Sequence, residues 1–502
     1  MSLRFFARFS LLRKVAILER YFVVVVFFAA ITTMVISMTI GLSQSIWFDE
    51  GYSISVAQQP IGELIALTTV DAHPPLYYLL LKAWMAIFGT GEFALRFSSV
   101  LCGGLSLVAL SWLLKDLFNR RIALLALPFV AFAPFLLRYN YEIRMYSFVM
   151  LIGVVATWVM VRAWQTRQAR WWIIYGALVA IGMYTLYMSV VFWLAHVVWL
   201  TIMAYQSKRN VVKQPFWLSY AGAVIVFLPW IPTVLSQLSS SALPPFMSTI
   251  TLYELTNILG LLMAYSAGWQ IGPWLTVLLV LFLSMFAYVF ANVWRRAVKR
   301  ERQALLLLIS CFVVGILFYA LISLPPNPPR FMDRYIVHIS IFWYALLGVV
   351  IAYGWRLKNK VPVYLLSIAT AILIASGVVT QAQIGNYNFQ RTQLLQAQVM
   401  RQEIGCEDTT FVTAGPYGYI DLKYNFAGCE MRYYYPWDVT LTGGFAPVND
   451  SVDRINTTQN VITSRLVYIY YDDSDVVLTP DDRFRQVARR DYDKTHVVIY
   501  ER

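Results

Sequence analysis

Charged residues are scarce in this sequence. Asp, Glu, Lys and Arg make up 13% of its 502 residues, whereas soluble globular proteins carry about 25%. Hydrophobic residues make up 59%, and the mean hydropathy is +0.59. This composition argues against a soluble enzyme, and it excludes a disordered chain. It is typical of a protein that crosses a membrane many times.

Signatures of several kinds of soluble chemistry are also lacking. No glycine-rich phosphate loop, cluster of zinc ligands or repeat of fixed period stands out. There are only four cysteines. Cys102 and Cys311 lie in apolar runs, where we expect them only to pack. Cys406 and Cys429 lie near the C-terminus, where a disulfide can persist if that part of the chain matures in an oxidising compartment.

What the sequence has instead is eleven apolar runs long enough to cross a membrane. They lie near residues 21–42, 97–114, 122–137, 145–161, 171–187, 189–205, 215–235, 273–293, 304–324, 335–354 and 361–380. The segments between them alternate in charge, and one alternate set holds 22 of the 28 Lys and Arg residues that precede residue 384. By the positive-inside rule this set is cytoplasmic. We therefore expect a multi-pass plasma-membrane protein with its N-terminus inside and its C-terminal tail outside.

The net charge of +13 does not indicate a nucleic-acid partner. Residues 1–383 contain 28 cations and 11 acids, whereas the remainder contains 12 cations and 16 acids. The positive charge therefore belongs to the membrane part. Eight of the 11 acids lie on the predicted outer side, where they do nothing for insertion: Asp49, Glu50, Glu63, Asp71, Glu92, Glu142, Glu254 and Asp333. Their concentration there is a first indication of function.

The predicted fold is an all-α membrane domain over residues 1–381, followed by a small extracytoplasmic α/β domain over 382–502. In the first outer loop, about 43–96, residues 60–69 and 74–88 predict interfacial helices. The second of these is apolar but shorter than the roughly 20 residues that a span requires. In the tail, a polar helix-like stretch precedes several strand-like runs. The helix-like stretch lies near 389–404, and the strand-like runs lie near 411–413, 431–435, 466–471 and 497–500.

Trp47-Phe48-Asp49-Glu50 places two adjacent carboxylates directly after the first span. One interpretation is the solvated start of a loop. The other is a catalytic base, since carboxylates among aromatic side chains are costly to dehydrate without a partner. Asp71 and His73 follow in the same loop, ahead of Tyr77. His73 could bind substrate hydroxyls or ligate a metal, although a lone histidine is more often only hydrogen-bonded locally. Asp71 could simply cap the helix that begins after Pro75.

Two further polar segments lie at predicted outer ends of spans. Arg138 and Glu142 are four residues apart, which fits either a local ion pair or a wall of a site that also includes Arg144.

Arg330, Arg334 and Tyr335 follow a proline-rich loop. If Arg330 and Arg334 share a helical face, they suit a lipid-linked phosphate through charge-assisted bonds. The alternative is that both arginines snorkel toward lipid headgroups.

These segments, in this order, resemble the polyprenyl-phosphate-sugar-dependent glycosyltransferases of the GT-C superfamily, and most of all the branch of protein O-mannosyltransferases and aminoarabinose transferases. The sequence segments that carry the resemblance are Trp47-Phe48-Asp49-Glu50, His73-Pro74-Pro75-Leu76-Tyr77-Tyr78, Phe88-Gly89 with Glu92-Phe93-Ala94-Leu95-Arg96, Glu142-Ile143-Arg144-Met145-Tyr146 and Arg334-Tyr335. The resemblance is strong over about 45–165, weaker to 340, and does not extend to the tail.

The resemblance implies a reaction. Asp49 matches the catalytic Asp that deprotonates an acceptor hydroxyl, which attacks the anomeric carbon with inversion. Arg334 matches a phosphate-binding arginine, and family members are mostly metal-independent, so no cofactor is expected. One departure is Gly51, where Ala is more usual. The implied partners are a polyprenyl-phosphate sugar, membrane lipids, and a lipid, polysaccharide or protein acceptor.

Two other classes fit part of this pattern. A transporter or lipid flippase also binds lipid phosphates, but it favours charges near the bilayer midplane and paired inverted repeats. Here the apolar runs are nearly free of charge and the acids gather on one side. A non-catalytic relative that only binds an acceptor would have no need of Asp49 and Arg334.

Overall fold

The computed structural model describes residues 19–239, 249–266, 272–324, 331–384, 399–426, 428–441, 443–449, 451–471, 477–492 and 495–502. By its internal contacts the chain divides into two units. The first unit consists of the chain up to Gly41 together with Arg96–Gln383. The second unit consists of Leu42–Leu95 together with the chain from Ile384 onward. The first outer loop, which the sequence division leaves with the membrane domain, thus belongs to the unit that contains the tail.

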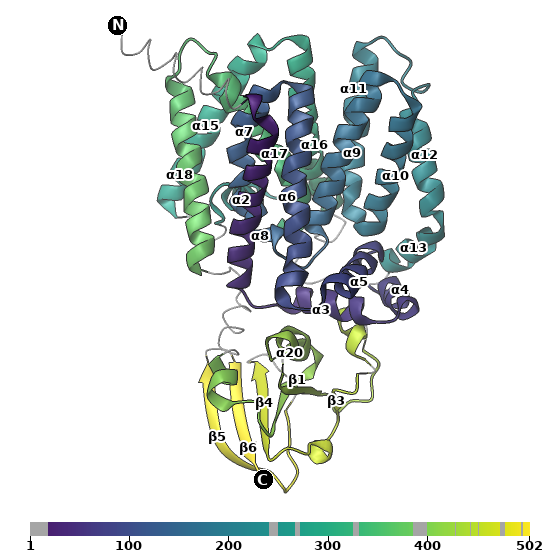
Figure 1. Ribbon diagram of the computed structural model, residues 1–502, viewed down its shortest axis with the longest axis vertical. Coiled ribbons are helices and arrows are strands. Elements are labelled where there is room, and N and C mark those ends of the chain that lie inside the picture. Colours follow the sequence, from purple (N-terminus) through teal and green to yellow (C-terminus); the bar gives the residue numbers. More distant parts are fainter. Residues whose placement is uncertain are drawn as a thin grey trace. The chain divides into compact units, whose positions relative to one another are not determined.

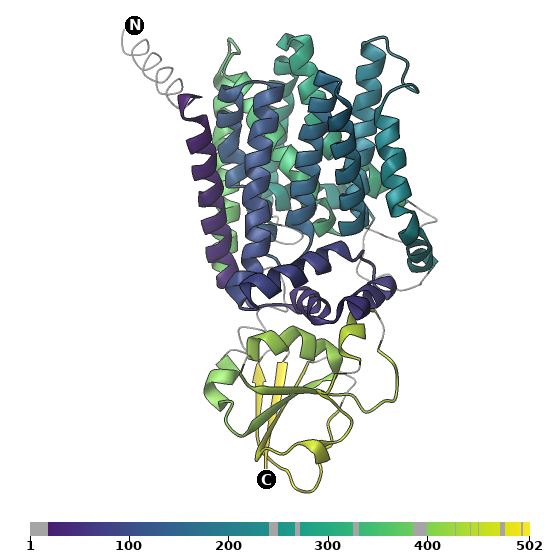
Figure 2. The same cartoon turned by 45° about the vertical axis from the view of Figure 1, so that its right-hand side comes forward.

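The first unit is a bundle of long apolar helices that run side by side (Figures 1 and 2). Nine helical segments among the described residues are long and apolar enough to cross a membrane. They are α2 (Phe22–Leu42), α6 (Glu92–Leu117), α9 (Tyr146–Thr166), η1 with α11 (Tyr187–Gln206), α12 with α13 (Phe216–Leu238), α15 (Pro273–Arg296), α16 (Lys299–Ile322), η4 with α17 (Asp333–Gly354) and α18 (Val361–Gln381).

A tenth span would be a bent pair of helices. Helix α7 (Arg120–Ala131) and helix α8 (Pro134–Asn140) meet at an angle of 68°. Pro134 occupies the first turn of α8, and Ala133 before it is extended, with φ −59° and ψ 111°. A proline disfavours helical geometry in the residue that precedes it, so the sequence itself ends α7 at this point.

The eleventh predicted span, near 171–187, forms α10 (Ala169–Thr185), a helix of 17 residues. At 1.5 Å per residue it is about 26 Å long, short for a bilayer core of about 30 Å. It nevertheless packs against α9 and α12 and lies within the bundle (Figure 1). The predicted fold class is confirmed, and among the described residues the number of spans by length and composition is nine or ten rather than eleven.

Helix α17 (Val337–Gly354) is the centre of the bundle, and every residue in it is buried. It packs against α7, α9, α15 and α16. At Gly348 an added Cβ atom would lie 2.7 Å from the Cα atom of Ala126 in α7. Small residues let membrane helices approach this closely, which explains why a glycine stands in the middle of the most buried helix.

In the second unit, the loop between the first two spans forms three helices: α3 (Phe48–Gln58), α4 (Ile61–Val70) and α5 (Leu76–Phe88). Helices α4 and α5 are apolar but short, with 10 and 13 residues. They confirm the two short helices predicted at 60–69 and 74–88. Helix α3 was not predicted as a helix.

The tail forms a six-stranded sheet in the order β3-β2-β1-β4-β6-β5. Its strands are β1 (Thr409–Ala414), β2 (Glu430–Tyr434), β3 (Arg454–Ile455), β4 (Arg465–Tyr471), β5 (Arg485–Tyr492) and β6 (Thr495–Glu501). Strands β3, β2, β1 and β4 are parallel, whereas β6 is antiparallel to both of its neighbours. Helix α20 (Gly415–Leu422) packs against β1 and β2, and it also packs against α3. The predicted α/β domain is therefore confirmed.

Candidate active site

The start of α3 separates the two adjacent carboxylates. Glu50 is fully buried, and its Oε2 atom accepts a hydrogen bond from the backbone N–H of Trp47 at 3.3 Å. It therefore closes the first turn of the helix in the manner of a capping box. Asp49 is half-buried. Consecutive helical side chains point about 100° apart, so only one of the two acids can be used in the cap, and that acid is Glu50.

The C-terminal domain packs directly on this helix. A Cβ atom at Gly51 would lie 2.5 Å from the carbonyl oxygen of Ile420 in α20. Glycine is thus required here because the backbone of α3 approaches the backbone of α20. The family resemblance marks Gly51 only as a departure from the more usual Ala. In the structure it is a point of close approach between two segments far apart in the chain.

Aromatic and polar contacts extend this interface on both sides of Asp49. The ring of Phe48 stacks on Tyr417 at a centroid distance of 4.9 Å and contacts Phe445 edge-on at 5.8 Å. Further along α3, Ser55 Oγ and Tyr424 Oη are 3.1 Å apart. Burial raises the pKa of Tyr424 to about 12, so this phenol stays protonated. The segment that carries Asp49 is therefore held by the C-terminal domain.

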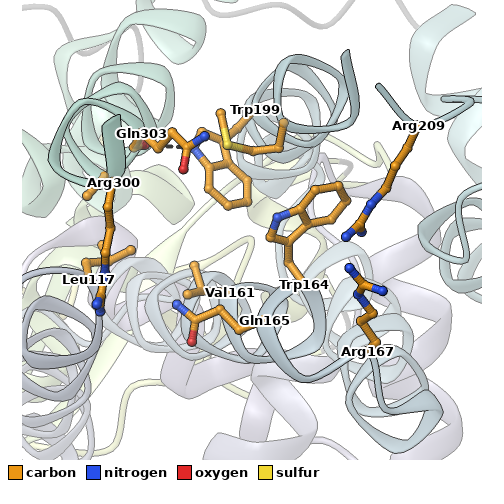
Figure 3. A pocket seen from close by; sticks show the side chains of 11 residues that line it. Leu117, Val161, Trp164, Gln165, Arg167, Trp199, Arg209, Arg300 and Gln303 are labelled. Atoms are coloured by element: carbon orange, nitrogen blue, oxygen red, sulfur yellow. Dashed lines mark hydrogen bonds between the residues drawn. The ribbon is translucent and has the colours of Figure 1, made fainter. Parts of the chain in front are cut away.

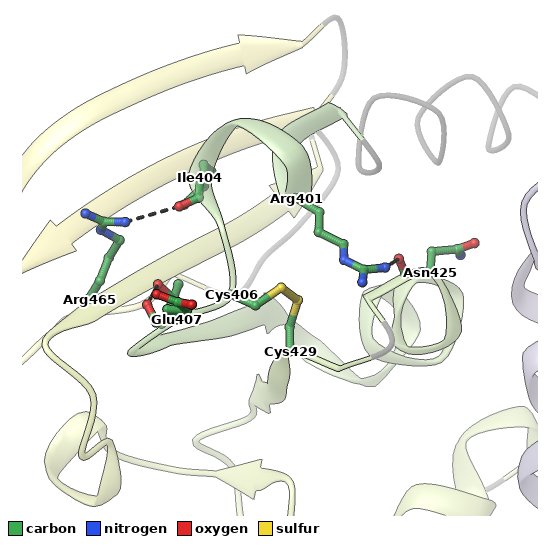
Figure 4. Close-up of a disulfide and its surroundings, with 8 residues drawn as sticks. Arg401, Ile404, Cys406, Glu407, Asn425, Cys429 and Arg465 are labelled. Carbon is green, nitrogen blue, oxygen red and sulfur yellow. Dashed lines mark hydrogen bonds between the residues drawn. A yellow bond between two sulfur atoms is a disulfide. The ribbon is translucent and has the colours of Figure 1, made fainter.

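A disulfide lies next to the same interface (Figure 4). Cys406 and Cys429 are bonded, with their Cα atoms 4.9 Å apart, as the sequence suggests. The segment just before Cys429 contains Asn425, whose side-chain amide donates to the carbonyl oxygen of Ile46 at 2.8 Å. Arg401 donates to the carbonyl oxygen of the same Asn425 at 3.3 Å. The disulfide thus fixes a segment that contacts the chain immediately before Trp47.

Asp71, His73 and Tyr78 form a second cluster in this unit. Asp71 Oδ2 lies 3.2 Å from His73 Nδ1 and accepts a hydrogen bond from Tyr78 Oη at 3.4 Å. The alternative that Asp71 caps the helix after Pro75 is wrong, because the N-cap residue of α5 is Pro75 itself. Tyr77 is buried. Among the described residues no three His, Cys, Asp or Glu side chains are grouped closely enough to hold a metal ion.

In the first unit, the predicted pair of Arg138 and Glu142 is present. Arg138 Nη1 lies 3.2 Å from Glu142 Oε2, and both side chains are buried. The guanidinium of Arg138 also lies 5.1 Å from the ring centroids of both Tyr139 and Tyr141. A buried ion pair needs such additional partners to offset the cost of desolvation. The local ion pair is therefore real, and it is compatible with a wall of a site.

Two further buried arginines accompany this pair. Arg144 is 4% exposed, and Arg96, near the start of α6, is fully buried. Arg96 Nη1 donates to the carbonyl oxygen of Tyr141 at 3.4 Å. The sequence analysis quotes Arg96 only as part of a motif and does not place it in the site. The signal that could have identified it is a cation directly before the apolar run 97–114.

Arg334 and Tyr335 lie in the short 3-10 helix η4 (Asp333–Ile336), which leads directly into α17. Both are half-buried, whereas Asp333 is exposed. The carbonyl oxygen of Tyr335 accepts a hydrogen bond from Tyr319 of α16 at 2.9 Å. Arg334 is therefore attached to the most buried helix of the bundle. Arg330 lies outside the described residues, so the predicted pairing of the two arginines on one face remains a prediction.

Part of the chain that contains several of these residues matches a known protein family. Residues 72–232 match the family described as dolichyl-phosphate-mannose-protein mannosyltransferase. That segment includes His73, Tyr77, Arg138, Glu142 and Arg144. No curated protein sequence matches the chain significantly.

Solved structures extend the likeness to nearly the whole chain. The crystal structure of ArnT from Cupriavidus metallidurans bound to undecaprenyl phosphate matches with a TM-score of 0.58 at 13% identity, over 95% of this chain and 97% of that one. The apo structure of ArnT matches with the same TM-score at 12% identity, over 96% and 97%. The chain therefore shares the fold of ArnT along nearly all its length, and its residues 72–232 match the dolichyl-phosphate-mannose-protein mannosyltransferase family.

Proposed function

We propose that this protein transfers a sugar from a polyprenyl-phosphate-linked donor to an acceptor hydroxyl on the extracytoplasmic side of the plasma membrane, with Asp49 as the general base. In this reaction the acceptor oxygen attacks the anomeric carbon as its proton passes to Asp49. The bond between the anomeric carbon and the phosphate oxygen breaks, and polyprenyl phosphate leaves with the electron pair. The anomeric configuration inverts.

The observation that carries the proposal is the division between Asp49 and Glu50. A general base must remain accessible to the proton that it removes. Glu50 is fully buried and accepts the backbone N–H of Trp47, whereas Asp49 is half-buried beside the stacked ring of Phe48. Of the two carboxylates that the sequence offers, only Asp49 therefore has the exposure that the role requires.

The donor phosphate is assigned to Arg334. A guanidinium binds phosphate through two parallel charge-assisted hydrogen bonds, and Arg334 is half-buried at the start of the central helix. Because Arg334 directly precedes α17, the helix would hold its guanidinium group in one place. The ArnT structure that shares this fold is bound to undecaprenyl phosphate, which supports a lipid phosphate as the leaving group.

The remaining predicted residues are proposed to bind substrate. Asp71, His73 and Tyr77 would contact the sugar or the acceptor, and Arg138 with Glu142 would form a wall whose charges are already paired. Arg144 belongs to the same buried segment. The reaction as written needs no metal ion, because a carboxylate base and an arginine supply the two charges that the transfer requires.

The proposal is tested with purified protein and a labelled polyprenyl-phosphate sugar. Glycosyl transfer predicts release of polyprenyl phosphate together with a labelled acceptor, in equal amounts. The acceptor is found by offering lipid, polysaccharide and peptide hydroxyls in parallel. A flippase would instead move intact donor between the leaflets of a vesicle and leave the sugar–phosphate bond unbroken. That outcome would refute the proposal.

A further inference from the structure

A cavity of about 470 Å³ lies at the other end of the first unit from Arg96. It is lined where α6 and α9 end, around Leu117 and Gln165, and where α16 begins, around Arg300. Leu117 is 21 residues after Arg96 in α6, which is about 32 Å along a helix that rises 1.5 Å per residue. The residues assigned to glycosyl transfer in this unit do not line it.

The rim of this cavity is basic. Arg167, Arg209 and Arg300 line it, and no carboxylate is found among the described residues that do so. Figure 3 shows the guanidinium groups of Arg167 and Arg209 pointing toward one another beside Trp164. The guanidinium of Arg209 lies 4.8 Å from the ring centroid of Trp164. Two like charges that face each other repel, and an anion bound between them would offset this repulsion.

The two acids next in sequence to lining residues, Asp116 and Glu301, already have partners, and Glu301 pairs with Arg356 at 3.5 Å. Asp116 forms an ion pair with Arg162 at 2.7 Å and accepts a hydrogen bond from the indole N–H of Trp158 at 2.8 Å. Arg300 reaches only the backbone carbonyl oxygen of Asp116, at 2.8 Å. No carboxylate of the described residues therefore pairs with Arg167 or Arg209 at the rim.

The backbone at Arg167 is unusual. This residue ends α9 with φ 57° and ψ 20°, in the left-handed region, where glycine is the usual choice. A side chain with a Cβ atom is sterically strained in this conformation. An arginine kept at such a position is consistent with a role for its side chain in binding.

The floor of the cavity is apolar, which distinguishes a lipid from a free anion. Leu117, Val161 and Met203 line it and are buried, and Trp164 meets Trp199 edge-on at 6.4 Å. The volume of about 470 Å³ is far larger than the roughly 10–15 Å³ that a single water molecule requires, so the cavity has room for a group larger than an inorganic ion. Tryptophans at the ends of spans are typical of the membrane interface.

We propose that this cavity binds the phosphate headgroup of an anionic membrane lipid, in the leaflet on the side of the basic loops. Arg167, Arg209 and Arg300 would contact the phosphate, and the apolar floor would take the glycerol and the first acyl carbons. Basic pockets between spans on this side of a membrane bind such headgroups in other proteins.

The test measures lipid retention rather than enzyme activity. Delipidated full-length protein is incubated with phosphatidylglycerol or phosphatidylcholine, and bound lipids are counted by native mass spectrometry. The wild type should retain phosphatidylglycerol in preference to phosphatidylcholine. The double variant Arg167→Gln, Arg209→Gln should bind phosphatidylglycerol about 25-fold more weakly, since each cation near a lipid surface contributes about fivefold.

A matched control removes the same charge from the same side of the bundle. Arg295→Gln with Lys358→Gln alters two exposed cations that do not line the cavity, and its affinity should stay within about twofold of the wild type. Gln165→Glu truncates nothing and places a carboxylate at the rim, so it should weaken binding by repulsion. Equal losses in the double variant and the control would overturn the proposal. Displacement of the lipid by an excess of inorganic phosphate would overturn it too, because the site would then bind a soluble anion.

Discussion

At the scale of single residues, Asp49 and Glu50 show how two adjacent identical charges acquire different roles. Glu50 is enclosed at the first turn of α3, where the helix dipole and the N–H of Trp47 both favour a negative charge. Replacing it with a residue that cannot accept this bond should cost about 1 kcal/mol of stability, as for other lost helix caps. Substitutions at Asp49 should leave this cap intact. The catalytic role proposed for Asp49 is therefore separable from the folding role of Glu50.

Arg334 provides the first prediction at this scale. Arg334→Lys keeps the charge but loses the planar fork that matches a phosphate. It should raise the donor KM on the order of tenfold, and Arg334→Ala should raise it further. The measurement is initial rate against donor concentration. Unchanged KM and kcat in both variants would remove Arg334 from the donor site.

At the scale of elements, the contact of α3 with α20 depends on Gly51. In Gly51→Ala the new Cβ atom would meet the carbonyl oxygen of Ile420 at 2.5 Å, and a backbone atom cannot swing aside. The cost of overpacking, about 1–3 kcal/mol, should exceed the gain of about 1 kcal/mol in helix propensity. We expect a lower Tm in detergent and faster hydrogen exchange in both helices.

Gly62 supplies the control for that variant. It lies in the neighbouring helix α4, and a Cβ atom there would meet nothing within 4 Å. Gly62→Ala should therefore leave stability unchanged or raise it by up to about 1 kcal/mol. If Gly51→Ala stabilised the protein as much as Gly62→Ala, the close approach of α3 and α20 would be contradicted.

Elements with strong periodicity were predictable from sequence, and those defined by their neighbours were not. Strands β1, β2, β4 and β6 were predicted because their apolar residues enter the core of the sheet. Strand β5, with the sequence RQVARRDY, lies at the edge of the sheet and pairs only with β6, so it shows no hydrophobic pattern. Tertiary contact alone makes it a strand.

The candidate site was predictable only as a set of residue types. Arg138 with Glu142 and Cys406 with Cys429 were proposed as pairs, and both pairs are present. Sequence periodicity could not choose between Asp49 and Glu50, because that choice depends on which side chain the fold buries. It could not reveal the role of Gly51 either, since Ile420 lies far away in the chain.

At the scale of the whole molecule, the side of the membrane on which each loop lies remains a prediction. Ser207 follows α11 in a basic segment, and Thr90 lies in the first outer loop between α5 and α6; both are exposed. With the positive-inside rule, single cysteines at these positions in a chain without other reactive thiols should be labelled from opposite sides. A membrane-impermeant maleimide on intact cells should modify the cysteine at Thr90 alone. Labelling of both from the same side would contradict the topology.

The most direct measurement of the central claim compares Asp49→Asn with Glu50→Gln in the assay of polyprenyl-phosphate release. Asp49→Asn keeps the shape of the side chain and removes its basicity, so kcat should fall on the order of 100-fold or more while the donor KM changes little. Glu50→Gln can still accept the N–H of Trp47, because glutamine also serves in capping boxes, and it should keep most of the activity. An active Asp49→Asn beside an inactive Glu50→Gln would assign the base to Glu50, and full activity in both would contradict a carboxylate base at the start of α3.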